Sequence, residues 1–348
     1  MTDMIEPWIF TSSSKPKLLV IYWPTACGKT ALTIDLAKKY NGEVINADSR
    51  QIYRGMNIGT GKVTAGEMEG VPHHMLDILD IHEMYGVGEF APEARYIIAD
   101  ITARGKLPIL SGGTGLFIDA VIWNFTIPEV PADWEYRDEL EAFRDKEGNE
   151  ALWEKLNAVD PDYASELDPR NYRYVIRGLE IWKATGQSKK VLGQKTESPY
   201  DFLRITPYDG DREKLYQKIN QRVEQMFQQW LIEEVLKLLE PYFPDFPGTF
   251  GDKSTQNHWE EINSLSTSAS DNQVSWRSNS ISSQTLSSDI VNQVIDRLPG
   301  LNAIGYREIL PYLAGTQSLE KTLELVQQNS RHYAKRQLTW FRRYNPRI

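Results

Sequence analysis

Residues 17–30 read KLLVIYWPTACGKT, an apolar run followed by a tight polar turn and the residues that open a helix. A loop between a strand and a helix directs backbone N–H groups at a phosphate chain, with a lysine for its outer oxygens and a hydroxyl for Mg²⁺. Lys29 and Thr30 hold those two positions. The stretch predicts an α/β fold with a phosphate-binding loop. The alternative interpretation is an ordinary strand-to-helix turn that carries a lysine.

Trp23 stands at the first position of this loop, where the pattern asks for glycine. A bulky residue forced to positive φ costs on the order of 1–2 kcal/mol. We therefore expect the loop either to close differently or to tolerate strain. The residues expected to bind the di- or triphosphate are Trp23, Pro24, Thr25, Ala26, Cys27, Gly28, Lys29 and Thr30.

The composition bounds the class of protein. A chain of 348 residues that is 41% hydrophobic supports one main domain and an appendage. A formal charge of −9 argues against indiscriminate coating of nucleic acid but allows a local basic groove. The single cysteine, Cys27, excludes disulfide scaffolds and zinc fingers. The stretch MTDMIEPWIF is neither a signal peptide nor a membrane span, so we expect a cytoplasmic protein without membrane contact.

Strands and helices alternate in the first part of the chain. Strands are expected at 17–22, 43–47 and 107–110, and helices at 31–40 and 93–104. This rhythm is typical of a parallel sheet, in which ligands bind beyond the carboxyl ends of the strands. The three strands end in polar or glycine-rich sets at 23–30, 48–51 and 111–115, so we expect one pocket to collect all three.

The remaining chain is helix-rich and is interrupted by a polar stretch. Helices are expected at 135–143, 150–159, 173–184, 213–239 and 318–342, and a serine-rich flexible insert at 249–289. We expect four segments: a first part of the catalytic core at 1–128, a helix-rich region at 129–240, the insert within 241–298, and a return to the core at 299–348.

Asp48, Gln51 and Thr114 are the candidates for chemistry beside the loop. Asp48 can bind Mg²⁺ through water or accept a proton from a nucleophile, and its alternative role is a helix N-cap. Gln51 can pair with a base edge or be an idle surface amide. Thr114 offers a hydroxyl within the glycine-rich set that follows the third strand.

Three further polar residues invite functional readings. His73 and His74 lie together, but no further histidine or cysteine lies at ligand spacing, so we expect a structural pair. Lys62 either contacts phosphate or is a solvated turn residue. In the C-terminal stretch 331–348, six cations occur without a carboxylate, which favours contact with an RNA backbone, while Trp340 is expected to pack inward.

Six motifs together resemble the bacterial tRNA dimethylallyltransferase family. They are WPTACGKT (23–30), INADSRQIYRGMNIGTGK (45–62), VPHHMLD (71–77), LSGGTGLFIDA (110–120), LNAIGYREI (301–309) and RHYAKRQLTWFRR (331–343). The resemblance implies a P-loop NTPase-like parallel sheet flanked by helices, with a smaller helical insertion domain. Two residues depart from the family pattern, because Trp23 replaces a glycine and Cys27 replaces a serine or threonine.

The same resemblance implies an activity. A dimethylallyl group passes from dimethylallyl diphosphate to the exocyclic amine of adenosine at tRNA position 37, beside the anticodon, and diphosphate leaves. Asp48 would take the proton of the amine, Thr30 would place Mg²⁺, and Thr114 would position the reacting groups. The partner would be the tRNA anticodon stem-loop, bound by a monomer. The implied tRNA contacts are Asp48, Ser49, Arg50, Gln51, Arg173, Arg177, Gly305, Tyr306, Arg307, Arg331, Lys335 and Arg336.

Three other functions stay open. A small-molecule P-loop kinase would share the loop and Asp48 but would have no use for the basic C-terminal stretch. A tRNA-binding protein disabled by Trp23 would keep that stretch and lack activity. An enzyme that prenylates free adenine nucleotides would share the chemistry without needing the stretch.

Overall fold

The computed structural model describes residues 2–125, 130–192, 196–208, 210–243 and 288–344. Backbone contacts divide the chain into two compact units. The first consists of Met1–Gly86, Glu93–Ile118 and Tyr200–Ile348, and the second of Val87–Pro92 and Asp119–Pro199. No described helix is both long enough and apolar enough to cross a membrane.

The first unit is built on a five-stranded parallel sheet with the strand order β3-β2-β4-β1-β5. The strands are β1 Lys17–Tyr22, β2 Gly42–Asn46, β3 His73–His74, β4 Leu107–Gly112 and β5 Asp201–Ile205. β1 and β2 are almost wholly buried, as expected for parallel strands that are covered on both faces. The predicted parallel sheet is confirmed.

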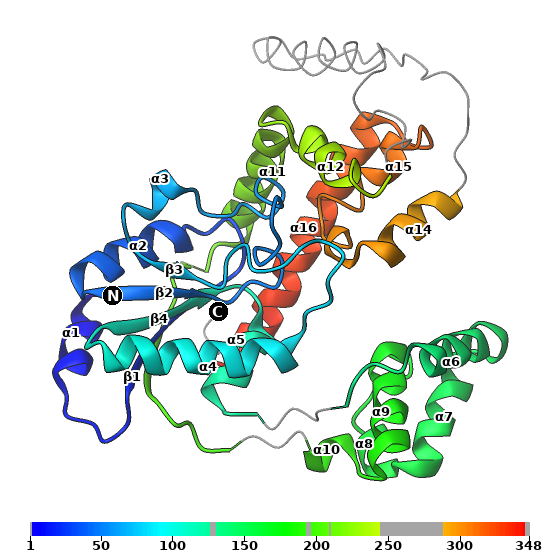
Figure 1. Ribbon diagram of the computed structural model, residues 1–348, viewed down its shortest axis with the longest axis horizontal. Helices are drawn as coiled ribbons and strands as arrows, with labels where there is room; N and C mark the ends of the chain where they lie inside the picture. The colour runs from blue at the N-terminus through cyan, green and yellow to red at the C-terminus, as the bar shows by residue number, and fades with distance from the viewer. Residues whose placement is uncertain (1, 126–129, 193–195, 209, 244–287, 345–348) are drawn as a thin grey trace. The chain divides into compact units, whose positions relative to one another are not determined.

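Helices cover both faces of this sheet (Figure 1). Ile5 of α1 (Thr2–Phe10) and Ile34 of α2 (Lys29–Lys39) pack with Leu19 and Ile21 of β1 in one core cluster. The part of α4 (Val87–Ala103) that belongs to this unit lies along the opposite face. Shorter helices, α3 Ala65–Met68 and α5 Gly115–Ile122, follow β2 and β4 along the chain.

A second core cluster in the same unit joins the C-terminal helices to residues 52–56. Its helices are α11 Arg212–Gln228, α12 Leu231–Leu239, α14 Ser288–Arg297, η1 Pro299–Leu301, α15 Leu310–Leu313 and α16 Leu319–Phe341. α16 packs against α11 and extends toward the sheet (Figure 1). The expected helix at 318–342 is confirmed.

The expected single helix at 213–239 is wrong, because the chain breaks it into α11 and α12 at Trp230. This residue adopts a left-handed conformation with φ 77°, which ends one helix and redirects the next. The amphipathic pattern continues through the break, so periodicity alone did not reveal it. The break is what places the buried carboxylate of Glu234 against the loop that carries Asn57 and Gly59.

The second unit is a small helical bundle with its own core of leucine, isoleucine, valine and tyrosine side chains. Its helices are α6 Trp134–Glu147, α7 Asn149–Val159, α8 Pro161–Ala164, α9 Tyr172–Thr185 and α10 Lys189–Leu192. The three helices expected here are confirmed. The expected segment 129–240 extends beyond this unit, because β5 pairs with β1, and α11 packs in the first unit.

α1 and β5 are among the elements that have no counterpart in the sequence-based expectations. α1 is anchored by an indole hydrogen bond from Trp8 to Asp201, whose carboxylate also accepts one from Lys17 at 2.6 Å. Most of the expected insert at 249–289 lies outside the described residues, and α14 begins at Ser288, close to where structure was expected to resume.

Candidate active site

The loop after β1 forms a compact cradle closed by its own lysine. Gly28 has φ 84° and caps α2, which begins at Lys29. The Lys29 ammonium donates to the carbonyl oxygens of Trp23 at 2.8 Å and Pro24 at 2.9 Å. Burial lowers the pKa of Lys29, and the nearby carboxylate of Asp48 opposes that shift. The ammonium group therefore lies where the oxygens of a bound phosphate could replace these two carbonyl oxygens as its partners.

Trp23 does not take the strained conformation that its position suggested. The positive φ values of the loop fall on Ala26, at 63°, and Gly28. The Trp23 side chain is fully buried and stacks on Tyr208, with ring centroids 4.6 Å apart, and on Phe341. The indole therefore points into the core and leaves the cradle open, so of the two expected outcomes the loop closes differently and Trp23 is not strained.

Asp48 follows β2 and forms a turn with the next residues. Its Oδ1 accepts a hydrogen bond from the backbone N–H of Arg50 at 2.9 Å. The Thr114 hydroxyl accepts from the backbone N–H of Ser49 at 3.1 Å, and the Thr114 N–H donates to the Ala47 carbonyl. Thr114 therefore fixes the turn that carries Asp48 and is not itself part of the pocket wall.

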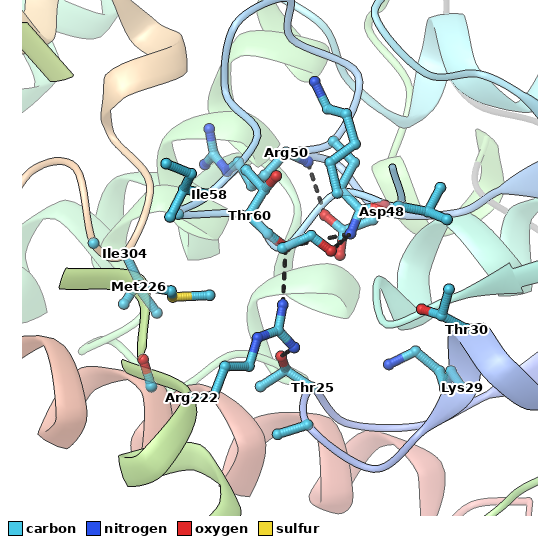
Figure 2. A pocket seen from close by; sticks show the side chains of 18 of the residues that line it. Thr25, Lys29, Thr30, Asp48, Arg50, Ile58, Thr60, Arg222, Met226 and Ile304 are labelled. Atoms are coloured by element: carbon cyan, nitrogen blue, oxygen red, sulfur yellow. Dashed lines mark hydrogen bonds between the residues drawn. The ribbon is translucent and has the colours of Figure 1, made fainter. Parts of the chain in front are cut away.

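A cavity of about 920 Å³ lies between the loop, this turn and helices α11 and α16. Figure 2 shows Lys29, Thr30 and Asp48 facing this single space. The predicted residues that line it are Thr25, Ala26, Cys27, Gly28, Lys29, Thr30, Asp48, Ser49, Arg50, Gln51, Gly305, Arg307 and Arg336. The predicted residues of the first unit that do not line the cavity are Trp23, Pro24, Thr114, Tyr306, Arg331 and Lys335.

Positive charge dominates the wall. Its cations are Lys29, Arg50, Lys62, Lys218, Arg222, Arg307 and Arg336, and its carboxylates are Asp48 and Glu67. Such an excess attracts a diphosphate or an RNA backbone. Asp48 lies among these cations.

Arg222 is a site residue that the sequence reasoning missed. Its guanidinium donates to the Thr25 hydroxyl at 2.8 Å and to the Thr60 carbonyl at 3.3 Å, as Figure 2 shows. Burial lowers its pKa, and the charge of Asp48 partly restores it. Arg222 lies within an amphipathic helix, and only the fold brings it to the loop.

The far side of the cavity is apolar. Ile58, Met226 and Ile304 are grouped together in Figure 2, apart from Lys29 and Thr30, and Ile219 and Val223 also line the pocket. Methionine and branched aliphatic side chains suit a short hydrocarbon chain. One cavity thus combines a phosphate cradle with a hydrophobic surface.

Tyr333 of α16, in the aromatic and basic C-terminal stretch, also belongs to the site. Burial raises the pKa of its phenol, and the charge of Asp48 raises it further, whereas the Thr114 hydroxyl opposes the shift. Tyr333 lines the pocket, and the Arg336 guanidinium lies 5.7 Å from its ring centre. The signal in the sequence was the mixture of aromatic and basic residues at 331–343.

The segment 302–307 divides between the pocket and its support. Tyr306 is fully buried and donates from its hydroxyl to Glu234 at 2.6 Å, so it supports the loop at 57–59 and offers no surface to RNA. This corrects the implied role of Tyr306. Arg307 lines the pocket, and its guanidinium pairs with Glu308 at 2.8 Å. Gly305, with φ 95°, allows the chain to turn there.

The other polar candidates have partners within the protein, and His73 and Lys62 also line the pocket. His74 pairs with the buried Glu43 at 2.9 Å, and His73 contacts the Val71 carbonyl. Lys62 is buried and pairs with Asp77 at 2.5 Å, so it is not a solvated turn residue. Trp340 packs over Gly115, as expected.

Gln51, Arg177 and Arg331 form hydrogen bonds within the protein. The Gln51 amide donates to the Thr60 and Gly61 carbonyls, each at 3.3 Å. Arg173 and Arg177 belong to α9 of the second unit, where Arg177 pairs with Glu180 and donates to the Val130 carbonyl at 2.8 Å. Arg331 donates to Asn220 at 2.6 Å, and Lys335 is exposed.

The described residues contain no cluster of three or more histidine, cysteine or acidic side chains that would hold a metal ion by themselves. Mg²⁺ commonly needs only one or two protein oxygens, because substrate phosphates and water supply the rest. Thr30, at the start of α2, and Asp48 both line the cavity and fit that requirement.

The comparisons with known proteins agree with this site. The family model described as IPP transferase matches residues 51–344. A tRNA dimethylallyltransferase of Halalkalibacterium halodurans is 41% identical over 94% of this chain and 88% of its own length. Another, of Geobacillus thermodenitrificans, is 40% identical over 95% of this chain and 89% of its own length.

Solved structures point the same way. The tRNA isopentenylpyrophosphate transferase of Bacillus halodurans is similar with a TM-score of 0.56 and 41% identity, covering 94% of this chain and 87% of that one. A eukaryotic dimethylallyltransferase acting on tRNA has a TM-score of 0.68 and 30% identity, covering 94% of this chain and 70% of that one. The fold is therefore P-loop NTPase-like, and the chain belongs to the IPP transferase family of tRNA dimethylallyltransferases.

Proposed function

We propose that this protein transfers the dimethylallyl group of dimethylallyl diphosphate to the exocyclic amine of adenosine at position 37 of tRNA. The observation that carries the proposal is that Lys29 and Asp48 line one cavity. The bond between the amine nitrogen and the allylic carbon forms, the bond from that carbon to the diphosphate oxygen breaks, and the amine proton passes to the Asp48 carboxylate.

The leaving group determines what the loop must do. Negative charge grows on the diphosphate in the transition state, and the Lys29 ammonium, the Arg222 guanidinium and the loop amides are positioned to stabilise it. Thr30 would hold Mg²⁺, which would add further charge stabilisation when bound. Ile58, Met226 and Ile304 would receive the methyl groups and keep water from the allylic carbon.

The acceptor in this proposal is the tRNA anticodon stem-loop. A base in a single-stranded loop leaves its stack at a cost of a few kcal/mol, so it can reach an enclosed pocket. Arg50, Arg307 and Arg336 line the cavity and would contact phosphates of the entering strand. The activity would be cytoplasmic, and a monomer would suffice because one chain supplies the whole pocket wall described here.

A transfer assay tests this proposal against its rivals. The protein is incubated with unmodified tRNA, with AMP, and with either dimethylallyl diphosphate labelled in its hydrocarbon or ATP labelled in its γ-phosphate. We expect label on tRNA from the diphosphate alone. Label that arrives from ATP would establish a kinase, and label on free adenine nucleotide in preference to tRNA would establish the small-molecule prenyltransferase. No transfer from either donor would leave a tRNA-binding protein.

A further inference from the structure

We propose that Gln337 of α16 is a positioning residue that holds the start of the phosphate loop against the end of β4. We call this connection between Gln337, the loop and the end of β4 the clamp. The clamp is a feature of the phosphate site, so the proposal rests on the proposed function only for the effect of the clamp on catalysis. Gln337 is buried, with 5% of its surface exposed, although glutamine is mostly an exposed residue.

One carboxamide makes both contacts. Gln337 Nε2 donates to the carbonyl oxygen of Gly113 at 2.8 Å, and its Oε1 accepts from the backbone N–H of Thr25 at 3.3 Å. Only an amide side chain supplies a donor and an acceptor at that spacing. The contacts join three parts of the chain that are far apart in sequence: the loop after β1, the residue after β4, and the C-terminal helix.

Gly113 is shaped for this contact. A Cβ atom built there would lie 2.4 Å from Gln337 Nε2, so any side chain would displace the amide. The next residue is Thr114, whose hydroxyl accepts from the Ser49 N–H and so fixes the turn of Asp48. The clamp therefore ties the diphosphate cradle to the same segment that positions the proposed base.

The clamp also determines which loop amides are free for a ligand. The Trp23 N–H donates to Gly112, Pro24 has no N–H, and the Thr25 N–H donates to Gln337. The start of the loop is thus fixed by the protein, and residues 26–30 remain along the pocket wall for phosphate oxygens. Loss of the clamp would let the cradle shift relative to Asp48.

Binding of inorganic pyrophosphate with Mg²⁺, followed by calorimetry, tests the clamp without catalysis. Gln337→Met keeps the volume and leaves the Thr25 N–H and Gly113 carbonyl unpaired, so we expect the Kd of pyrophosphate to rise about tenfold. The KM for dimethylallyl diphosphate should rise by a similar factor, with the Kd for tRNA changed less than about twofold on the same reasoning. Gln328→Met, at an exposed position of the same helix, should change none of these values.

Gly113→Ala is the second variant, because it displaces the amide of Gln337 while the sequence of α16 stays unchanged. It should weaken pyrophosphate binding as Gln337→Met does, and the double variant should bind no more weakly than the weaker single variant. Unchanged pyrophosphate affinity in both variants, additive effects, or a parallel loss of tRNA binding would overturn the clamp. Failure of wild-type protein to transfer a dimethylallyl group, with the pyrophosphate results as expected, would refute only the proposed function.

Discussion

The indole of Trp23 lies nearly parallel to the ring of Tyr208, with centroids 4.6 Å apart and an interplanar angle of 21°. Phe341 of α16 also stacks on Trp23, with ring centroids 5.9 Å apart. A residue that the phosphate-loop pattern asks to be glycine has here become part of the hydrophobic core. Its effect is on stability, and the cradle remains open.

Replacing Trp23 by glycine should therefore destabilise the protein. The substitution removes a fully buried side chain and leaves a cavity, at a cost of about 3–5 kcal/mol, which lowers Tm by about 10 °C. Thermal unfolding followed by circular dichroism measures this. Trp230→Gly is the matched control, because Trp230 is half exposed and its φ of 77° suits glycine. A Trp23→Gly protein as stable as wild type, with higher activity, would restore the view that Trp23 obstructs the site.

Gly61→Ala should displace Arg222 from the cradle. A Cβ atom at Gly61 would lie 1.6 Å from Arg222 Nη2, and the positive φ of 57° adds strain. Loss of the charged hydrogen bond to Thr25 should lower kcat/KM for dimethylallyl diphosphate about tenfold. Gly66→Ala serves as the control, since nothing lies within 4 Å of a Cβ there. Equal kcat/KM in the two variants would show that Arg222 does not contribute to diphosphate binding.

Glu233 should make stability depend on pH. Burial raises its pKa from 4.5 to about 7, and its Oε2 has no hydrogen-bond partner among the described residues. A carboxyl whose pKa is raised in the folded state stabilises the protein below pH 4.5, and this contribution is lost as the pH rises to about 7.

Glu233→Gln should remove that pH dependence. At pH 8 it should raise the free energy of unfolding by about 1–2 kcal/mol, a range discounted for partial solvent access. Urea unfolding across this pH range measures the effect, with the exposed Glu240→Gln as control. Parallel pH profiles of wild type and Glu233→Gln would show that the carboxyl is solvated in the folded protein.

Lys335 should contribute to the salt dependence of tRNA binding. It is exposed on α16 within the stretch whose six cations lack a carboxylate. Lys335→Ala should reduce the slope of log affinity against log salt by about 0.7–0.9, the value for one phosphate contact. Lys321, on the same helix, pairs with Glu324 at 2.8 Å, and its replacement should leave the slope unchanged. The same slope in both variants would place the RNA elsewhere.

Much of the fold followed from local patterns. The strands at β1, β2 and β4 are apolar runs that end in polar sets, so both their existence and the pocket at their ends could be predicted. β5 could not be predicted, because its partly exposed residues 201–205 alternate too weakly to reveal an edge strand. The break at Trp230 was hidden because the apolar period continues across it.

The candidate site likewise contains residues that could be predicted from the sequence and residues that could not. Lys29 and Asp48 could be predicted because each follows a strand of the parallel sheet, and ligands bind beyond the ends of such strands. Arg222 and Gln337 could not, since their roles depend on tertiary contacts from distant helices. Tyr306 shows the opposite case, in which a residue within a functional motif supports a loop from the core.

In the proposed reaction, the Lys29 loop holds the diphosphate while Asp48 receives the proton of the amine. Single-turnover transfer from dimethylallyl diphosphate to tRNA by Asp48→Asn tests it most directly, because asparagine keeps the size and the acceptor for the Arg50 N–H. We predict a rate about 10²- to 10⁴-fold lower than that of wild type, with the affinities for pyrophosphate and tRNA unchanged. A wild-type rate, or a loss of tRNA binding at an unchanged rate of transfer, would contradict the claim.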